Sequence, residues 1–155
     1  MTYSFCEDLE RYDILAQEYI EMCEKEMVRL QSEPDSRKNR ERVNKIRCDE
    51  AEMLAKLERF DDALELYQMV LDTYKEEGYS QLELCSYRCK IAEINYYANR
   101  FDDALETYLH VLQIYQKEEA DMLDLSDVCG EIRECYLKLG EYESGATKWD
   151  MFTSL

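Results

Sequence analysis

Apolar residues recur every three or four positions along most of the chain, which is the spacing of an amphipathic α-helix. The clearest case runs from Phe60 to Tyr74, and its apolar positions return in the same order from Phe101 to Tyr115. A second helical stretch precedes each of these two. Residues of about 5–30 show the same spacing and predict an extra N-terminal helix. The pattern therefore indicates an all-α protein.

The six residues Phe-Asp-Asp-Ala-Leu-Glu at positions 60–65 return unchanged at positions 101–106, which is 41 positions later. A weaker copy begins at Tyr142, after the same interval. A constant period predicts an array of similar units, and each unit reads as a helical hairpin. We expect one domain over residues 1–155, with an N-terminal helix at 4–31 and repeats at 37–77, 79–118 and 121–153.

Residues that favour helix ends support these boundaries. Glu58, Asn99 and Gly140 occupy equivalent places just before the repeated motif, and asparagine and glycine accept the left-handed conformation that ends many helices. Gly78 predicts another helix end, and the segment Ser80–Glu83 has the spacing of a capping box that starts the next helix. The chain is therefore predicted to turn between repeats at this point.

These features resemble the tetratricopeptide repeat family, in a longer form than its common 34-residue repeat. The resemblance covers residues of about 40–153. It depends on small and aromatic residues at equivalent positions: Ala51 and Ala92; Phe60, Phe101 and Tyr142; Ala63, Ala104 and Gly145; Tyr67, Tyr108 and Trp149. Three arginines depart from the family pattern, namely Arg47, Arg88 and Arg133. The resemblance implies a right-handed superhelical array of helix-turn-helix repeats, with a concave groove lined by the first helix of each unit.

A groove of this kind would present one row of carboxylates, from Glu52, Glu93 and Glu134. The other residues expected to bind a partner are Lys45, Cys48, Lys56, Cys89, Tyr96, Tyr97, Leu137 and Lys138. Carboxylates beside aromatic side chains favour a basic or amphipathic segment of a partner protein. Exposed ion pairs add only about 0.2–1 kcal/mol each, so the aromatic side chains must supply the rest of the affinity. The alternative is a solvated acidic face with no binding role.

Charge restricts the classes of partner. The chain has 36 acidic and 19 basic residues, for a net charge of −17. Such a charge repels nucleic acid phosphates and anionic lipid, and it attracts basic partners. One basic stretch, residues 37–47, interrupts this pattern. It is either a solvated face that pairs with nearby acids or a docking patch for an acidic partner.

Nothing in the sequence indicates catalysis, a cofactor or a metal. The seven cysteines contain no Cys-x-x-Cys pair, and His110 is the only histidine, so four zinc ligands at a usual spacing are missing. There is no phosphate-binding loop and no nucleophile motif. We therefore expect a protein that is not an enzyme and that binds no cofactor.

A second function remains open, in which the chain is a structural subunit. It would self-associate or dock permanently in a larger complex through apolar terminal helices, with Trp149, Met151 and Phe152 at the C-terminal end. A third function, recruitment of chaperones by their acidic tails, is disfavoured by the glutamate row. No long apolar run predicts membrane insertion, and no signal peptide is recognisable, so the cytosol or the nucleoplasm is the expected location.

Overall fold

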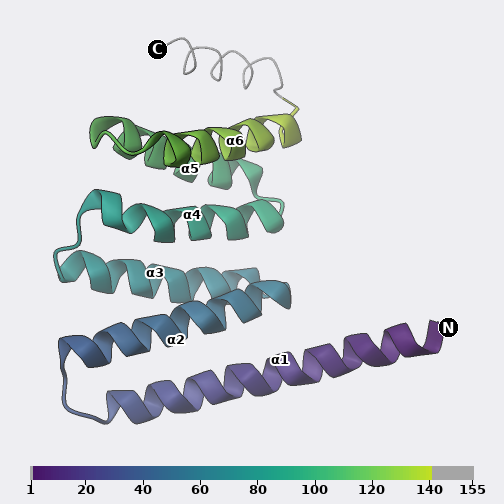
Figure 1. Cartoon of the computed structure of the whole chain (residues 1–155). Coiled ribbons are helices and arrows are strands. Elements are labelled where there is room, and N and C mark those ends of the chain that lie inside the picture. Colours follow the sequence, from purple (N-terminus) through teal and green to yellow (C-terminus); the bar gives the residue numbers. More distant parts are fainter. Residues whose placement is uncertain (1, 141–155) are drawn as a thin grey trace. The chain divides into compact units, whose positions relative to one another are not determined.

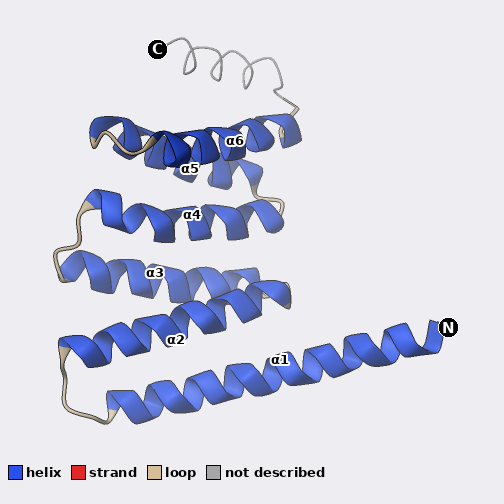
Figure 2. Ribbon diagram, in the orientation of Figure 1, coloured by secondary structure: helices blue, strands red, loops and turns tan. Residues whose placement is uncertain are grey.

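The computed structural model describes residues 2–140, with side chains from Asp8 onward. Every regular element in this range is a helix (Figure 2). The helices are α1 (Thr2–Gln31), α2 (Arg37–Lys56), α3 (Phe60–Glu76), α4 (Gln81–Tyr97), α5 (Phe101–Lys117) and α6 (Met122–Lys138). The predicted all-α repeat array with an extra N-terminal helix is confirmed. The second helix of the third predicted repeat lies outside the described residues.

The chain divides into two compact units, Met1–Val70 and Leu71–Leu155. The described part of the first unit contains α1, α2 and the first part of α3, whereas that of the second contains the end of α3 and the helices α4, α5 and α6 (Figure 1). Helices α3 and α5 begin 41 positions apart, as do α4 and α6, so the repeated sequence motif corresponds to repeated helices.

In the first unit, α1 and α2 form a helical hairpin joined by a short loop around Pro34. The buried face of α1 consists of Ala16, Ile20, Cys23 and Leu30, which are three, four or seven positions apart and therefore share one side of the helix. Helix α1 packs against α2, and these four side chains are the ones that it buries.

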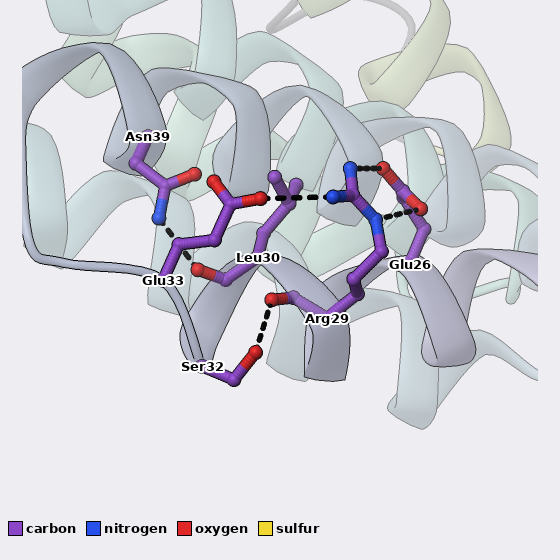
Figure 3. A network of polar contacts seen from close by, with 6 residues as sticks. All are labelled: Glu26, Arg29, Leu30, Ser32, Glu33 and Asn39. Carbon is purple, nitrogen blue, oxygen red and sulfur yellow. Dashed lines mark hydrogen bonds and ion pairs between the residues drawn. The ribbon is translucent and has the colours of Figure 1, made fainter.

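Polar contacts lie at the loop that joins α1 to α2 (Figure 3). Asn39 donates from Nδ2 to the carbonyl oxygen of Leu30, so a side chain of α2 satisfies one of the last carbonyl groups of α1. The Ser32 hydroxyl donates to the carbonyl oxygen of Arg29 at 2.6 Å. Arg29 also pairs with Glu26 and with Glu33. These exposed ion pairs add little stability, whereas the bonds to the helix end define where α1 stops.

The core of the second unit lies among α4, α5 and α6. Small side chains, such as Cys85, Ala92 and Ala104, are fully buried and allow close approach of the helices. The larger members of this core are Tyr108, Val111, Ile114, Val128, Ile132 and Tyr136. The hydrophobic spacing predicted from the sequence therefore corresponds to a real core.

The predicted helix ends adopt the left-handed conformation. Glu58, Asn99 and Gly140 have φ angles of 61°, 61° and 73°, and each lies one residue after a helix C-cap. In the turn after α4, the amide of Asn99 donates to the carbonyl of Tyr96, and that of Arg100 donates to Asn95 at 2.8 Å. This pair of bonds is the Schellman arrangement, which satisfies carbonyl groups that a helix end leaves open.

Candidate functional site

A pocket with a volume of about 300 Å³ lies in the second unit, between three helices. Its lining residues are Ser86, Cys89 and Glu93 from α4, Tyr108 and Tyr115 from α5, and Asp124, Asp127, Val128 and Glu131 from α6. On each helix the lining positions are mostly three, four or seven residues apart, so they share one face. The pocket is therefore a product of helical spacing and of how α4, α5 and α6 pack.

Caps at the helix starts position two of these faces. The Ser80 hydroxyl accepts from the amide of Glu83, and the Glu83 carboxylate accepts from the amide of Ser80 at 2.8 Å, so the predicted capping box is confirmed. At the start of α6, the Asp121 carboxylate accepts from the amide of Leu123 at 2.7 Å. Such caps stabilise a helix by about 0.5–2 kcal/mol and define where it begins.

The pocket is strongly acidic. Four of its nine lining residues are Asp or Glu, and none of the nine is Lys, Arg or His. Burial raises the pKa of Glu131, and the negative charges of Glu93, Glu134 and Asp127 raise it further. Carboxylates from α4 and α6 thus disfavour one another's ionised forms. A positively charged group in the pocket would relieve this repulsion, so the site favours cations over anions.

Three other lining residues are neutral and polar. Burial raises the pKa of Cys89 to about 11, so its thiol stays protonated at neutral pH and is a poor nucleophile. Burial also raises the pKa values of Tyr108 and Tyr115, which keeps both phenols protonated. A hydrogen bond joins Cys89 to Tyr115. These three lining residues therefore offer a protonated thiol, hydroxyl groups and aromatic rings rather than a reactive group.

Two of the predicted partner-binding residues, Cys89 and Glu93, line this pocket. Glu93 is half-buried and lies 3.8 Å from the Nζ atom of Lys90. Tyr96 lies on the same helix. Burial is the largest cause that raises its pKa, and the negative charge of Glu134 is the next. Glu134 therefore lies near Tyr96, although neither lines the pocket. The structure brings these four residues to one region of the second unit.

The remaining predicted residues of this unit are exposed and lie outside the pocket lining. Tyr97 is 63% exposed, and its ring meets that of Tyr96 edge-on at 5.8 Å. Leu137 is 37% exposed and Lys138 is exposed; both lie in the last turn of α6. Their role in binding stays a prediction.

The other four predicted residues lie on α2, in the first unit. Lys45, Glu52 and Lys56 are exposed, whereas Cys48 is half-buried. The row of carboxylates predicted to join Glu52 with Glu93 and Glu134 stays a prediction, because these residues belong to different units.

The basic start of α2 pairs largely with nearby acceptors. Arg37 donates to Glu41 at 3.2 Å, and Arg40 donates to Asp35 at 2.7 Å. Deeper in the helix, Arg47 donates to the Oδ1 atom of Asn44 at 3.0 Å. These contacts favour the interpretation of residues 37–47 as a face with local partners over that of a docking patch.

Sequence reasoning missed most of the pocket. Tyr108 and Tyr115 fit the apolar stripe of α5, so the pattern assigned them to the core. The acids of α6 carried a usable signal, because Asp124, Asp127 and Glu131 fall at i, i+3 and i+7 on one helix face. That spacing could have been found, but the repeat alignment singled out only the carboxylates with a counterpart in another unit.

Within the part of the chain that the structure describes, no three Cys, His, Asp or Glu side chains are arranged to hold a metal ion. No helix among the described residues has the length and apolar character needed to cross a membrane.

Comparisons with known proteins agree with the helical repeats. Residues 44–117 match the family model described as tetratricopeptide repeat. This segment belongs to the tetratricopeptide repeat family. The resemblance inferred from the sequence motifs is therefore confirmed here, and the matched segment includes the helices α3, α4 and α5 together with most of α2.

A solved structure with a similar fold is the crystal structure of BtubC (BKLC) from P. vanneervenii. The two share 20% sequence identity with a TM-score of 0.66, over 94% of this chain and 57% of that chain. At this identity the similarity shows the fold alone, and the present chain spans a little over half the length of that protein. No curated protein is significantly similar in sequence.

Proposed function

We propose that the chain is a non-catalytic adaptor that binds a basic or amphipathic segment of a partner protein on the surface of α4 and α6. Membership of residues 44–117 in the tetratricopeptide repeat family indicates a protein–protein interaction module. The observation that carries the choice of partner is the pocket, which holds four carboxylates and no basic side chain. The net charge of −17 adds a longer-range attraction for basic segments.

Charge alone does not supply enough affinity for such a partner. Exposed ion pairs contribute about 0.2–1 kcal/mol each, and salt weakens them further. Aromatic side chains beside the acids can supply the rest through burial of apolar surface. Tyr96 and Tyr97 lie next to the acidic surface and are at least partly accessible, with Tyr97 63% exposed. An amphipathic segment therefore fits this surface better than a purely basic one.

Reversal of two charges tests the proposal. A double variant, Glu93→Lys with Glu134→Lys, is compared with wild type in affinity capture from cell lysate, read by mass spectrometry at ~0.02 M and ~0.15 M salt. The matched control is Glu65→Lys with Glu106→Lys, which changes the net charge equally at two exposed residues on α3 and α5. We expect partners to be lost from the first variant and retained by the second.

The outcomes separate a local site from a general charge effect. Equal loss of partners in both double variants would show that net charge alone attracts them. Retention in both would exclude the α4–α6 surface. A single Glu134→Lys variant, which leaves the pocket lining intact, reports on the acidic surface outside the pocket.

A second function, docking in a larger assembly, is favoured by one observation on α1. Tyr12, Leu15, Tyr19 and Met22 are 44%, 58%, 38% and 66% exposed, and their spacing of three or four places them on one side of the helix. An exposed apolar row of this kind is typical of an interaction surface. The C-terminal residues predicted for this role, Trp149, Met151 and Phe152, lie outside the described residues.

Concentration-dependent mass distinguishes self-association from the adaptor function. Light scattering of the full chain over a hundredfold range of concentration should show a rising mass if α1 joins two copies. The double variant Leu15→Glu with Met22→Glu should then remain a monomer throughout. A wild-type chain that is monomeric over the whole range would exclude self-association through this row.

A further inference from the structure

Glu50 is a carboxylic acid buried inside the hairpin of α1 and α2. It is 4% exposed and lies on the same face of α2 as Val43 and Leu54, which are seven and four positions away. Its Oε2 atom has no hydrogen-bond partner among the described residues. A buried carboxyl with an unsatisfied oxygen is far more costly when it is ionised than when it is protonated. The packing of this face therefore depends on a single proton.

The charged and titratable groups around Glu50 come from three elements. Cys23 and Glu24 belong to α1, Asp49 precedes Glu50 on α2, and Arg59 lies in the turn before α3. Burial is the largest cause that raises the pKa of Glu50, and the charge of Glu24 and a hydrogen bond with it add to the effect. Arg59 acts in the opposite direction. Two acids thus face each other across the contact between α1 and α2.

The contact that holds α1 on α2 involves only part of the helix. Residues from Asp8 to Leu15 are exposed, so the first half of α1 contributes no buried side chain among those described. The buried side chains are Ala16, Ile20, Cys23 and Leu30. Residues 32–36 connect this helix to α2 (Figure 1). A helix with few buried contacts can open locally while its neighbours remain folded.

We propose that a proton on Glu50 controls the docking of α1: the helix stays packed on α2 while Glu50 is protonated, and it opens far more often when Glu50 is ionised. Opening gives the carboxylate access to water and removes the nearby charge of Glu24. It also uncovers the apolar residues beside Glu50 on α2. This device does not use the surface of α4 and α6, so it can fail without affecting the proposed adaptor function, and the reverse also holds.

Proton linkage gives the direction and size of the effect. The pKa of Glu50 is about 7 in the docked state and should return toward 4.5, the value of an unperturbed glutamate, when α1 opens. The docked state therefore holds the proton more tightly, so docking is firmest at low pH and weakens as pH rises through this range. Since the two pKa values differ by about 2.5, the opening equilibrium should change by about 300-fold over the whole range.

Labelling of the Cys23 thiol measures the opening. This residue is 7% exposed, so N-ethylmaleimide should reach its thiol mainly when α1 opens. The reagent is added to the full chain at about pH 5.5 and 8, and mass spectrometry of the digested protein reads Cys23 separately. Each rate is divided by that of Glu50→Gln at the same pH, which cancels the effect of pH on the thiol. We expect this ratio to rise by about 25-fold between the two conditions.

Two further variants test the contribution of the facing acid. Glu24→Gln removes the charge that α1 places near Glu50 and should reduce the rise by about twofold or more. Glu21→Gln removes the same charge at another exposed position of α1 and should leave the rise unchanged. A rise that is equal in Glu24→Gln and in wild type would exclude the pair of acids as part of the device.

Hydrogen exchange distinguishes the opening of α1 from unfolding of the whole first unit. Protection of amides in α1 should fall with rising pH in wild type and stay constant in Glu50→Gln, while amides of α2 around Ala51 should change much less. Parallel loss of protection in α1 and α2 would show that the hairpin unfolds as one body and would overturn the proposal. A Cys23 labelling ratio that is the same at both pH values would also overturn it.

Discussion

The hairpin of α1 and α2 and the region formed by α4, α5 and α6 differ in what they bury at equivalent repeat positions. Ile132 of α6 is 5% exposed and belongs to the apolar core of the second unit. Its counterpart in α2, 82 positions earlier, is Glu50, which is 4% exposed. Burial and the nearby Glu24 carboxylate raise the pKa of Glu50 to about 7, and Arg59 opposes this shift only weakly.

A second pair of equivalent positions shows the same difference. Asn44 of α2 and Cys85 of α4 are both fully buried. The Oδ1 atom of Asn44 accepts from Arg47, but its Nδ2 atom has no hydrogen-bond partner among the described residues, and neither has the Oε2 atom of Glu50. Cys85, in contrast, donates from its thiol to the carbonyl of Gln81.

The repeat motif therefore sets the positions of the helices but not the chemistry of each interface. Helix α2 packs against α1, which is not part of the family-matched segment and places Glu24 near Glu50. Helices α4 and α6 pack against α5, whose buried face is apolar apart from the phenol of Tyr108. Stability of the first hairpin should therefore depend on pH more strongly than that of the second region.

The largest effect is expected from placing a buried carboxylate in the second unit, at the position equivalent to Glu50. Ile132→Glu would place a carboxylate in an apolar core, at a cost of about 3–5 kcal/mol at pH 8. Urea unfolding followed by circular dichroism measures the loss. Ile132→Val, which removes one methyl group, is the control and should cost only about 0.5–1.5 kcal/mol. A glutamate variant no less stable than the valine variant would show that this position tolerates charge as position 50 does.

Several parts of the fold could be predicted from the sequence because they depend on neighbouring residues. Helical spacing, the capping box at Ser80 and the left-handed residues Asn99 and Gly140 are all local signals. The pocket could be predicted only in part, because a tyrosine in an apolar stripe looks the same whether its hydroxyl faces a neighbour or a cavity. The spacing predicts Tyr108 as a core residue, and its 3% exposure agrees, but the same residue also lines the pocket.

The burial of Glu50 was not predictable for a different reason. Alignment of the repeats places it opposite two isoleucines, but an acidic residue in so acidic a chain gives no sign of being buried. Its environment depends on Glu24 and Arg59, which come from α1 and from the turn after α2. Whether such a residue is buried depends on contacts between separate elements, which the local sequence does not show.

An intermediate effect is expected from Glu50→Gln. The folded state holds the Glu50 proton up to a pKa of about 7, against 4.5 for an unperturbed glutamate, so it binds more protons than the unfolded state between these values. Wild-type stability should therefore fall as pH rises from about 4.5 to 7 and stay low above it. Since one pKa unit corresponds to ~1.4 kcal/mol, the variant should be more stable than wild type by about 1–3 kcal/mol at pH 8.

The pH dependence of this gain identifies its cause. The difference between Glu50→Gln and wild type should shrink toward zero as pH falls to about 4.5, where the native carboxyl is protonated and resembles the amide. Urea unfolding at pH 8, 6.5 and 5 measures it. Glu65→Gln, at an exposed residue of α3, removes the same charge and should give a much smaller difference at every pH. A gain at position 50 that does not vary with pH would exclude protonation as its source.

The smallest effect is expected where the repeats differ at their turns. Glu58, Asn99 and Gly140 share the left-handed conformation, but only Glu58 has a side chain poorly suited to it. That conformation costs an ordinary residue about 1–2 kcal/mol, and glycine removes this cost. Glycine also makes the unfolded chain more flexible, which cancels part of the gain. Glu58→Gly should therefore stabilise the first unit by about 0.5–1 kcal/mol, whereas Asn99→Gly should gain only a few tenths.

Hydrogen exchange of amides in α2 and α4 measures each effect in its own unit. Slower exchange in α2 of Glu58→Gly, with no change in α4, is the expected result. Faster exchange in α2 would mean that the glutamate side chain makes a favourable contact at this turn that outweighs its backbone strain. In that case the two turns would differ by side-chain contacts rather than by backbone conformation, although they share the same Schellman hydrogen bonds.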